Sequence, residues 1–192
     1  MAANDVLVAS PVTGTGGVLR APLGTPIPAD STTELSAPFA PQGYVGEDGI
    51  SMTTDRSTEK IRAWGGDSVR TVQTEHDVTF SLTFLETTEL TLKAVFGDTN
   101  VTATAAGAGN GNRLAVQVKS DVLPSQVWAF DMKDGKKKVR VVLPNASITE
   151  VGDTQFVHSD ATGYEVTIDA LPDEDGVKAY IYSDDGATTD GG

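Results

Sequence analysis

The chain has 192 residues, of which 39% are hydrophobic and 21% are charged, and it contains no cysteine. This length suits one domain with one core, while the lack of cysteine excludes disulfides, thiolate metal sites and cysteine nucleophiles and suits a reducing cytoplasm. The formal net charge of -13 argues against a protein that holds nucleic acid through its phosphates, because such binding relies on lysine and arginine.

Residues 1–43 are rich in proline and glycine, and we interpret them as an extended arm outside the core. Six of the nine prolines lie within the first 41 residues, and proline cannot donate a hydrogen bond to a β-ladder. The glycine-rich residues 14–17 are interpreted as a flexible part of this arm. A disordered terminus and an arm that docks on a neighbouring subunit both fit, and scattered apolar residues favour docking. Those apolar residues are Val18, Leu19, Leu23, Ile27, Leu35 and Phe39.

The first residues also bear on localisation. They show no basic leader and no apolar run long enough for export or for a membrane span. We therefore expect no membrane anchor.

Residues 56–84 predict a long β-hairpin with a glycine turn at residues 64–68. From residue 78 to residue 84, apolar side chains alternate with hydroxyl side chains, which is typical of a half-buried strand. Residues 56–63 are polar at both parities, so this strand fits exposure on one side and coverage by another chain on the other. Earlier in the chain, Glu47-Asp48-Gly49 predicts a turn between two short extended pieces.

The remaining elements point to a β protein. Residues 85–97 fit a helix and a strand about equally well, and residues 98–112 have the composition of a flexible loop. Strand patterns then recur around a strong hairpin turn at Asp134-Gly135. These patterns cover residues 113–119, 127–132, 136–143, 164–170 and 177–181. The predicted fold is mostly β, a β-sandwich or barrel with at most one helix, with its body at residues 44–182 and a flexible tail at residues 183–192.

The two histidines offer little for catalysis or metal binding. Glu75, His76 and Asp77 are adjacent in a predicted strand, so they alternate between opposite faces and cannot converge on one ion. His158 lies in a loop-like region and is interpreted as a surface residue. No spacing selects a pair of carboxylates for hydrolysis. We therefore expect no enzymatic activity and no cofactor.

The densest basic patch consists of Lys136, Lys137, Lys138 and Arg140. It fits a charged edge that deters aggregation. It also fits a surface that meets the acidic C-terminal part of a neighbouring copy and helps one copy stack on the next, since residues 149–192 carry 11 acidic residues and one lysine.

Several short segments, taken in order, carry a resemblance to a known family. They are Ala-Pro-Leu-Gly-Thr-Pro-Ile-Pro (21–28), Gly-Tyr-Val-Gly-Glu-Asp-Gly (43–49), Ala-Trp-Gly-Gly-Asp (63–67), Val-Arg-Thr-Val-Gln-Thr (69–74), Asp-Val-Thr-Phe-Ser-Leu-Thr-Phe-Leu-Glu-Thr (77–87), Val-Phe-Gly-Asp (95–98), Ala-Leu-Pro-Asp (170–173) and Lys-Ala-Tyr-Ile-Tyr (178–182). In this order they resemble the major tail proteins of long, flexible-tailed bacteriophages, especially those that infect actinobacteria.

The resemblance implies a structural virion protein, the major subunit of a tail tube. Its expected features are a β-sandwich, one flanking helix at residues 87–96, and six copies per ring, with rings stacked into a hollow tube that conducts DNA. A long hairpin of each subunit would join an inner β-barrel shared between subunits. The expected hairpin and interface residues are Arg56, Glu59, Lys60, Arg62, Trp64, Gly65, Gly66, Arg70, Gln73 and Glu75.

An acidic lumen would repel DNA phosphates, and Glu59, Glu75 and Asp77 are candidate lining residues. The sequence does not fix their parity, because Lys60, Arg62 and Arg70 compete for the same face.

The resemblance also implies partners: further copies of this chain, a tape measure protein, and proteins that terminate or tip the tail. The protein would be assembled in the host cytoplasm into the virion tail, and DNA would pass without specific binding. A tube protein of a contractile injection system would share the fold and need a sheath partner.

Two other classes stay open beside this one. A carbohydrate-binding β-sandwich usually shows exposed aromatic residues, whereas Trp64 and Trp128 are far apart in this sequence. An acid–base hydrolase would require a clustered pair of carboxylates.

Overall fold

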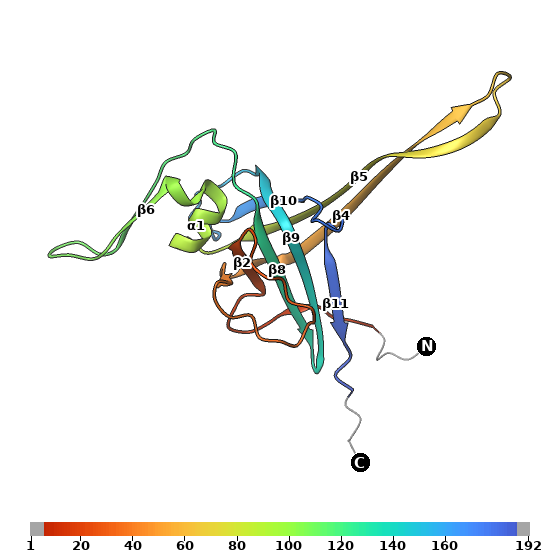
Figure 1. Cartoon of the computed structure of the whole chain (residues 1–192). Coiled ribbons are helices and arrows are strands. Elements are labelled where there is room, and N and C mark those ends of the chain that lie inside the picture. The colour runs from red at the N-terminus through yellow and green to blue at the C-terminus, as the bar shows by residue number, and fades with distance from the viewer. Residues whose placement is uncertain (1–5, 188–192) are drawn as a thin grey trace, which may run out of the picture.

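The computed structural model of the protein describes residues 6–187, which form a mostly β fold with one α-helix (Figure 1). The strands are β1 (Ser10–Pro11), β2 (Val18–Pro22), β3 (Ala40–Pro41), β4 (Val45–Arg62), β5 (Ser68–Phe84), β6 (Val101–Thr104), β7 (Arg113–Val116), β8 (Gln126–Asp134), β9 (Lys137–Val151), β10 (Tyr164–Ala170) and β11 (Tyr180–Asp184). The helices are α1 (Glu89–Phe96) and the 3-10 turn η2 (Asp98–Asn100).

One antiparallel sheet dominates the molecule, with strand order β3-β2-β8-β9-β10-β5-β4. The short strand β1 adds to β8, and β11 adds to β9 on the same side as β10. The strands β6 and β7 form a separate two-stranded hairpin beside α1 (Figure 1). The large sheet ends at β4, whose outer edge has no partner strand among the described residues.

The sheet curls onto itself and thereby encloses the core. Phe80 of β5 and Phe130 of β8 have β9 and β10 between them in the sheet order, a separation of about 14 Å if the sheet were flat. Their ring centroids are 5.4 Å apart, so the two ends of the sheet face each other as the layers of a sandwich do. Leu92 and Val95 of α1 pack into the same core. The predicted β fold with one flanking helix is confirmed.

Residues 85–97, whose pattern fits a helix and a strand about equally well, contain the helix α1. The Thr88 hydroxyl accepts a hydrogen bond from the Thr91 amide, which caps the N-terminus. Gly97 ends the helix at a φ of 97°, a conformation that favours glycine. With both ends capped, the apolar stripe that includes Leu92 and Val95 faces the core.

The expected arm is partly wrong, because residues 18–22 form a core strand. β2 pairs along β8, and Val18, Leu19 and Ala21 are buried. Ala21 also belongs to a second, smaller apolar cluster, which includes Val127 and Val142. Proline misled the interpretation, since Pro22 lies at the end of β2, where a missing donor costs little.

The glycine-rich residues 14–17 are also not a flexible part of an arm. A Cβ atom on Gly16 would lie 2.0 Å from the Gly43 carbonyl oxygen, so glycine is needed there for close backbone contact. Further along, Asp30 accepts hydrogen bonds from the amide and hydroxyl groups of Thr33 and Thr32, which hold its pKa below the usual range.

Three further expectations change. Residues 47–49 are a bulge inside β4 and not a turn between two strands, because the register with β5 shifts between Val45 and Ile50. Residues 98–112 include η2 and β6, so the loop is shorter than predicted and covers residues 105–112, which connect β6 to β7. Residues 183–184 belong to β11, while residues 188–192 of the expected tail lie outside the described part of the chain.

The contact between Phe80 and Phe130 predicts a large stability effect. We expect Phe80→Ala to lower the free energy of unfolding by about 3–5 kcal/mol, because Phe80 is 2% exposed and its removal leaves a cavity. Phe156→Ala is the matched control; that ring is 81% exposed, so its loss should change the free energy by less than about 0.5 kcal/mol. Urea unfolding of both variants is the measurement, and equal effects would contradict this account of the core.

Candidate assembly surface

The inner half of the β4–β5 hairpin packs on the core, and its outer half projects from the body. From Val78 to Phe84 every second residue of β5 is buried, whereas residues 68–75 are all exposed. Figure 1 shows the outer half of the hairpin extending away from the body. β10 pairs with β5 only as far as Thr79, so beyond that point β5 has an open edge, as β4 has along its whole length. The projecting hairpin therefore presents two rows of unpaired backbone groups, which is a template for pairing with another chain.

The register of the hairpin separates its charges onto two faces. Residues directly opposite each other share a face, and on one face Asp55 lies opposite Asp77, Ser57 opposite Glu75, and Glu59 opposite Val72. We name this the acidic face. The opposite face carries the pairs Arg56–His76, Thr58–Gln73 and Lys60–Thr71, together with Arg62, and we name it the basic face.

A β-bulge explains why the odd–even alternation of residues in the sequence could not assign side chains to these two faces. The register shifts between Ser57 and Thr58, which leaves Thr74 without an opposite residue. Gln73 and Glu75 therefore lie on different faces although they are two residues apart. Arg70 lies opposite Ile61 and so shares the acidic face, while Lys60 and Arg62 do not.

The acidic face continues across the body of the protein as the side of the sheet that faces away from the core. Its further members on β5, β10 and β9 are Thr79, Ser81, Thr83, Glu165, Thr167, Asp169 and Glu150. The core-facing residues of β5, such as Phe80, continue the basic face instead. Sequence reasoning did not single out Asp55, Glu150, Glu165 or Asp169, although the alternation of β10 gave a usable signal.

Lys178 partly offsets the like charges of Asp55 and Asp77. Its Nζ lies 3.3 Å from Asp77 Oδ1 and donates to the His76 carbonyl oxygen. Because Asp77 is 65% exposed, solvent screens this pair and it adds little stability. The acidic face thus keeps most of its negative charge.

The tip of the hairpin is a defined turn that presents one aromatic side chain. Gly65 and Gly66 have φ values of 110° and 98°, a region that favours glycine. The Arg62 guanidinium donates to the Gly66 carbonyl oxygen at 2.8 Å, and the Ala63 amide donates to the Asp67 carbonyl oxygen at 2.8 Å. Trp64 has a relative exposure of 107%. The tip therefore offers its indole ring to any partner.

The basic patch lies at the other hairpin, β8–β9, and only part of it is on the surface. Lys136 and Lys138 are exposed, and Lys138 lies opposite Asp184 of β11. Arg140 is 3% exposed; its Nη2 donates to Asp131 Oδ2 at 2.9 Å and its Nη1 to the Asp30 carbonyl oxygen at 3.0 Å. The side chain of Arg140 therefore stabilises this chain internally, and a contact through it between copies is the wrong expectation.

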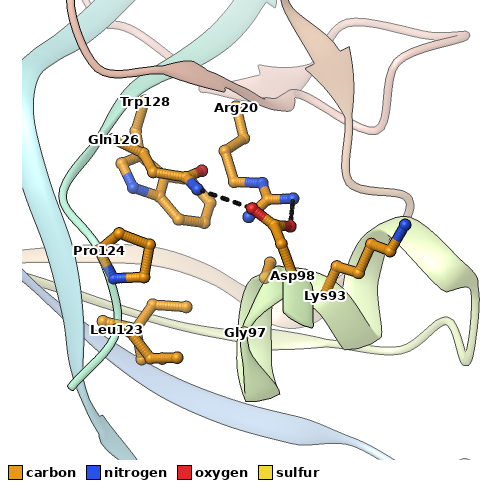
Figure 2. Close-up of a pocket in the computed structure, with 10 residues that line it drawn as sticks. Arg20, Lys93, Gly97, Asp98, Leu123, Pro124, Gln126 and Trp128 are labelled. Atoms are coloured by element: carbon orange, nitrogen blue, oxygen red, sulfur yellow. Dashed lines mark hydrogen bonds and ion pairs between the residues drawn. The ribbon is translucent and has the colours of Figure 1, made fainter. Parts of the chain in front are cut away.

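The polar side chains that line the small pocket between α1 and β8 bind one another, and the pocket is too small to be a substrate site (Figure 2). Asp98 joins Arg20 at 3.1 Å and accepts from Gln126 Nε2 at 3.4 Å, as Figure 2 shows. The pocket has room for about 10 Å³, close to the least that one water molecule needs. It has no space for a sugar or another organic substrate.

Within residues 6–187, no group of three or more His, Asp or Glu side chains is placed to hold a metal ion. No helix in that part of the chain has the length and apolar character to cross a membrane.

A β-rich body with a projecting hairpin that has two open edges is the architecture of a protein that can associate through strand edges. The family model for phage tail tube proteins matches residues 1–191. The chain therefore belongs to the phage tail tube protein family. It is a structural protein of the virion tail.

A search of curated protein sequences found no match. Among solved structures, the chain is similar to the tube-terminating cap of the anti-feeding prophage, determined by cryo-electron microscopy, with 10% identity and a TM-score of 0.45; the match covers 96% of this chain and 99% of that chain.

The like-charged pair Asp55–Asp77 predicts a measurable local effect. We expect Asp55→Asn to slow amide hydrogen exchange in the outer part of β4 and β5 at low salt, because directly opposed like charges destabilise a β-ladder. The gain should shrink at high salt, which screens the repulsion. Thr53→Asn, on the same face but without a charge change, is the control, and equal exchange in the two variants would contradict the repulsion.

Proposed function

We propose that copies of this chain join edge to edge into closed rings, six per ring as the resemblance implies, and that the rings stack into a hollow tube. The observation that carries this proposal is the pair of open edges on the β4–β5 hairpin. Pairing one edge of a copy with a different edge of the next is a head-to-tail contact, which closes into a ring when the rotation per subunit allows. Residues 56–75 would then belong to an inner barrel built from several chains.

The acidic face would line the lumen of this tube. On the body, the other side of the sheet carries the core, so the acidic face is the side of the body that is free to point to an open channel, and it continues along the projecting half of the hairpin. The candidate lining residues Glu59, Glu75 and Asp77 lie on that face together with Arg70, while Lys60 and Arg62 lie on the other. Four carboxylates (Asp55, Glu59, Glu75 and Asp77) outweigh Arg70 on the hairpin part of this face. Such a wall repels phosphates and gives DNA few places to bind, which suits passage of DNA through the tube.

Further expectations follow from the same proposal. Tail proteins that measure the length of the tube or end it are the expected partners, and assembly would take place in the host cytoplasm. Lys136, Lys137 and Lys138 would contribute to contacts between rings, without Arg140. These features are supported by the family and by the position of the lysines at the end of the β8–β9 hairpin.

The ring proposal is tested by electron microscopy of the purified chain over a concentration series. We expect hollow tubes or rings from the parent, and none from a variant in which residues 56–76 are replaced by a short Asn-Gly turn, since this removes the projecting part of both open edges. The variant should still unfold cooperatively, because none of the removed residues is in the core. Tubes from the shortened variant, or a parent that stays monomeric at every concentration, would overturn the proposal.

The lumen assignment has its own test, with two variants of equal charge. Ser57→Lys with Glu75→Gln changes a pair on the acidic face, and Thr58→Lys with Gln73→Lys changes the neighbouring pair on the basic face; each double substitution raises the net charge by two. We expect assembled tubes of the first variant to retain a short DNA duplex several-fold better than the parent in co-sedimentation at low salt, and to release it as salt rises. Retention by the second variant alone would assign the lumen to the basic face.

A further inference from the structure

An apolar groove opens on the body beside α1. It lies between the helix, β7, residues 118–123 and the C-terminal end of β9, and Leu92, Val95, Leu114, Val122, Val151 and Phe156 line it. Val122 is 95% exposed and Phe156 is 81% exposed. Large apolar side chains gathered around a groove in this way usually mark a contact surface.

The groove and the hairpin tip lie at opposite ends of the same long element. β5 begins next to the tip, runs into the core and leads through residues 85–88 directly into α1. Its 17 residues span about 55 Å at the usual rise of a strand. In Figure 1 the tip and α1 accordingly lie on opposite sides of the body. In a stack of identical copies whose repeat direction runs along β5, the tip end of one copy meets the α1 end of the next.

The chemistry of the two ends is complementary. The tip presents the fully exposed Trp64 with Arg62 and Arg70 close by in the turn and strand. Asp121 lines the groove and Asp153 lies between two of its lining residues, with Lys119 as an opposing charge. An aromatic ring at an exposed position, flanked by arginine, is a typical anchor of a protein interface.

From these observations we propose that the groove binds the β4–β5 hairpin tip of a second copy of this chain, with Trp64 inserted between α1 and Phe156. The contact rests on the proposed function, since it joins copies in successive rings. It gives Trp64 a partner that the single chain does not provide, and it covers the apolar side chains of the groove.

Tryptophan fluorescence gives the first test. The chain has two tryptophans, and Trp128 is already 2% exposed, so its emission reports the core. The difference between the parent and Trp64→Phe isolates Trp64. We expect the emission of Trp64 to shift to shorter wavelength when monomers assemble into tubes. An emission that keeps the wavelength of a solvated indole in tubes seen by electron microscopy overturns the contact.

Disulfide trapping gives the second test, and the absence of native cysteine makes it specific. Ala63→Cys and Thr154→Cys variants keep Trp64 and Phe156 and place a cysteine near each of them in the chain. Mixed, assembled and oxidised, they should give a covalent heterodimer as the main cross-linked product. A mixture of Ala63→Cys with Leu23→Cys is the control, because Leu23 is 56% exposed and does not line the groove.

The outcomes separate the two proposals. Tubes without the cross-link between positions 63 and 154, or with equal cross-linking to position 23, overturn the docking of the tip and leave the ring proposal standing. Absence of rings and tubes under all conditions overturns the proposed function, and this contact with it.

Discussion

The structure depends on one continuous two-stranded ladder, β4 with β5, of which only half is supported by a core. An isolated β-hairpin is marginally stable in water, and the outer half of this one buries no side chain. Its order comes from the inner half, where Leu82 and Phe84 are held in the main core and fix the register of the pair. The hairpin is thus positioned by the body, while its unpaired edges are left for other copies to complete.

The pairing of β4 with β5 also separates acidic and basic side chains onto opposite faces of the hairpin. Because cross-strand neighbours share a face, two strands of mixed composition become one side rich in carboxylates and one side rich in basic groups. The acidic arrangement is unfavourable for the isolated chain, since Asp55 and Asp77 repel each other and Lys178 compensates only one of them. The repulsion lowers the stability of the ladder at this point. The proposed role of the acidic face in the lumen would explain why both carboxylates are present.

The sequence predicted the features that depend on local pattern. The alternation from Val78 to Phe84, the glycine turn of the long hairpin and the Asp134-Gly135 turn all lie where the periodicity and turn chemistry placed them. The helix needed the family resemblance, because Leu92 and Val95 fit both periods. What pattern could not reveal were features set by distant partners. β2 is a core strand only because β8 lies beside it, and Arg140 is buried only because Asp131 and the Asp30 carbonyl receive its donors.

The faces of the hairpin are the clearest example of this limit. The extra residue Thr74 inverts the parity of β5, so any assignment that counted alternate residues from Val78 outward would place Glu75 correctly and Gln73 wrongly. Only the pairing with β4, which has no extra residue at that point, shows where the inversion occurs.

Open edges and exposed apolar side chains are hazards for a protein that must remain dispersed before it assembles. The net charge of -13 opposes random association through repulsion between copies. The proposed assembly would bring carboxylates of several copies around a narrow channel, so backbone pairing and burial of apolar groups must outweigh that repulsion. Backbone pairing and apolar burial are complete only when the hairpins of two copies pair in register. A partial contact brings the same charges together with fewer hydrogen bonds and less burial, so the repulsion disfavours partial contacts more than correct ones. The acidic face would therefore favour ordered growth as well as a channel to which DNA does not adhere.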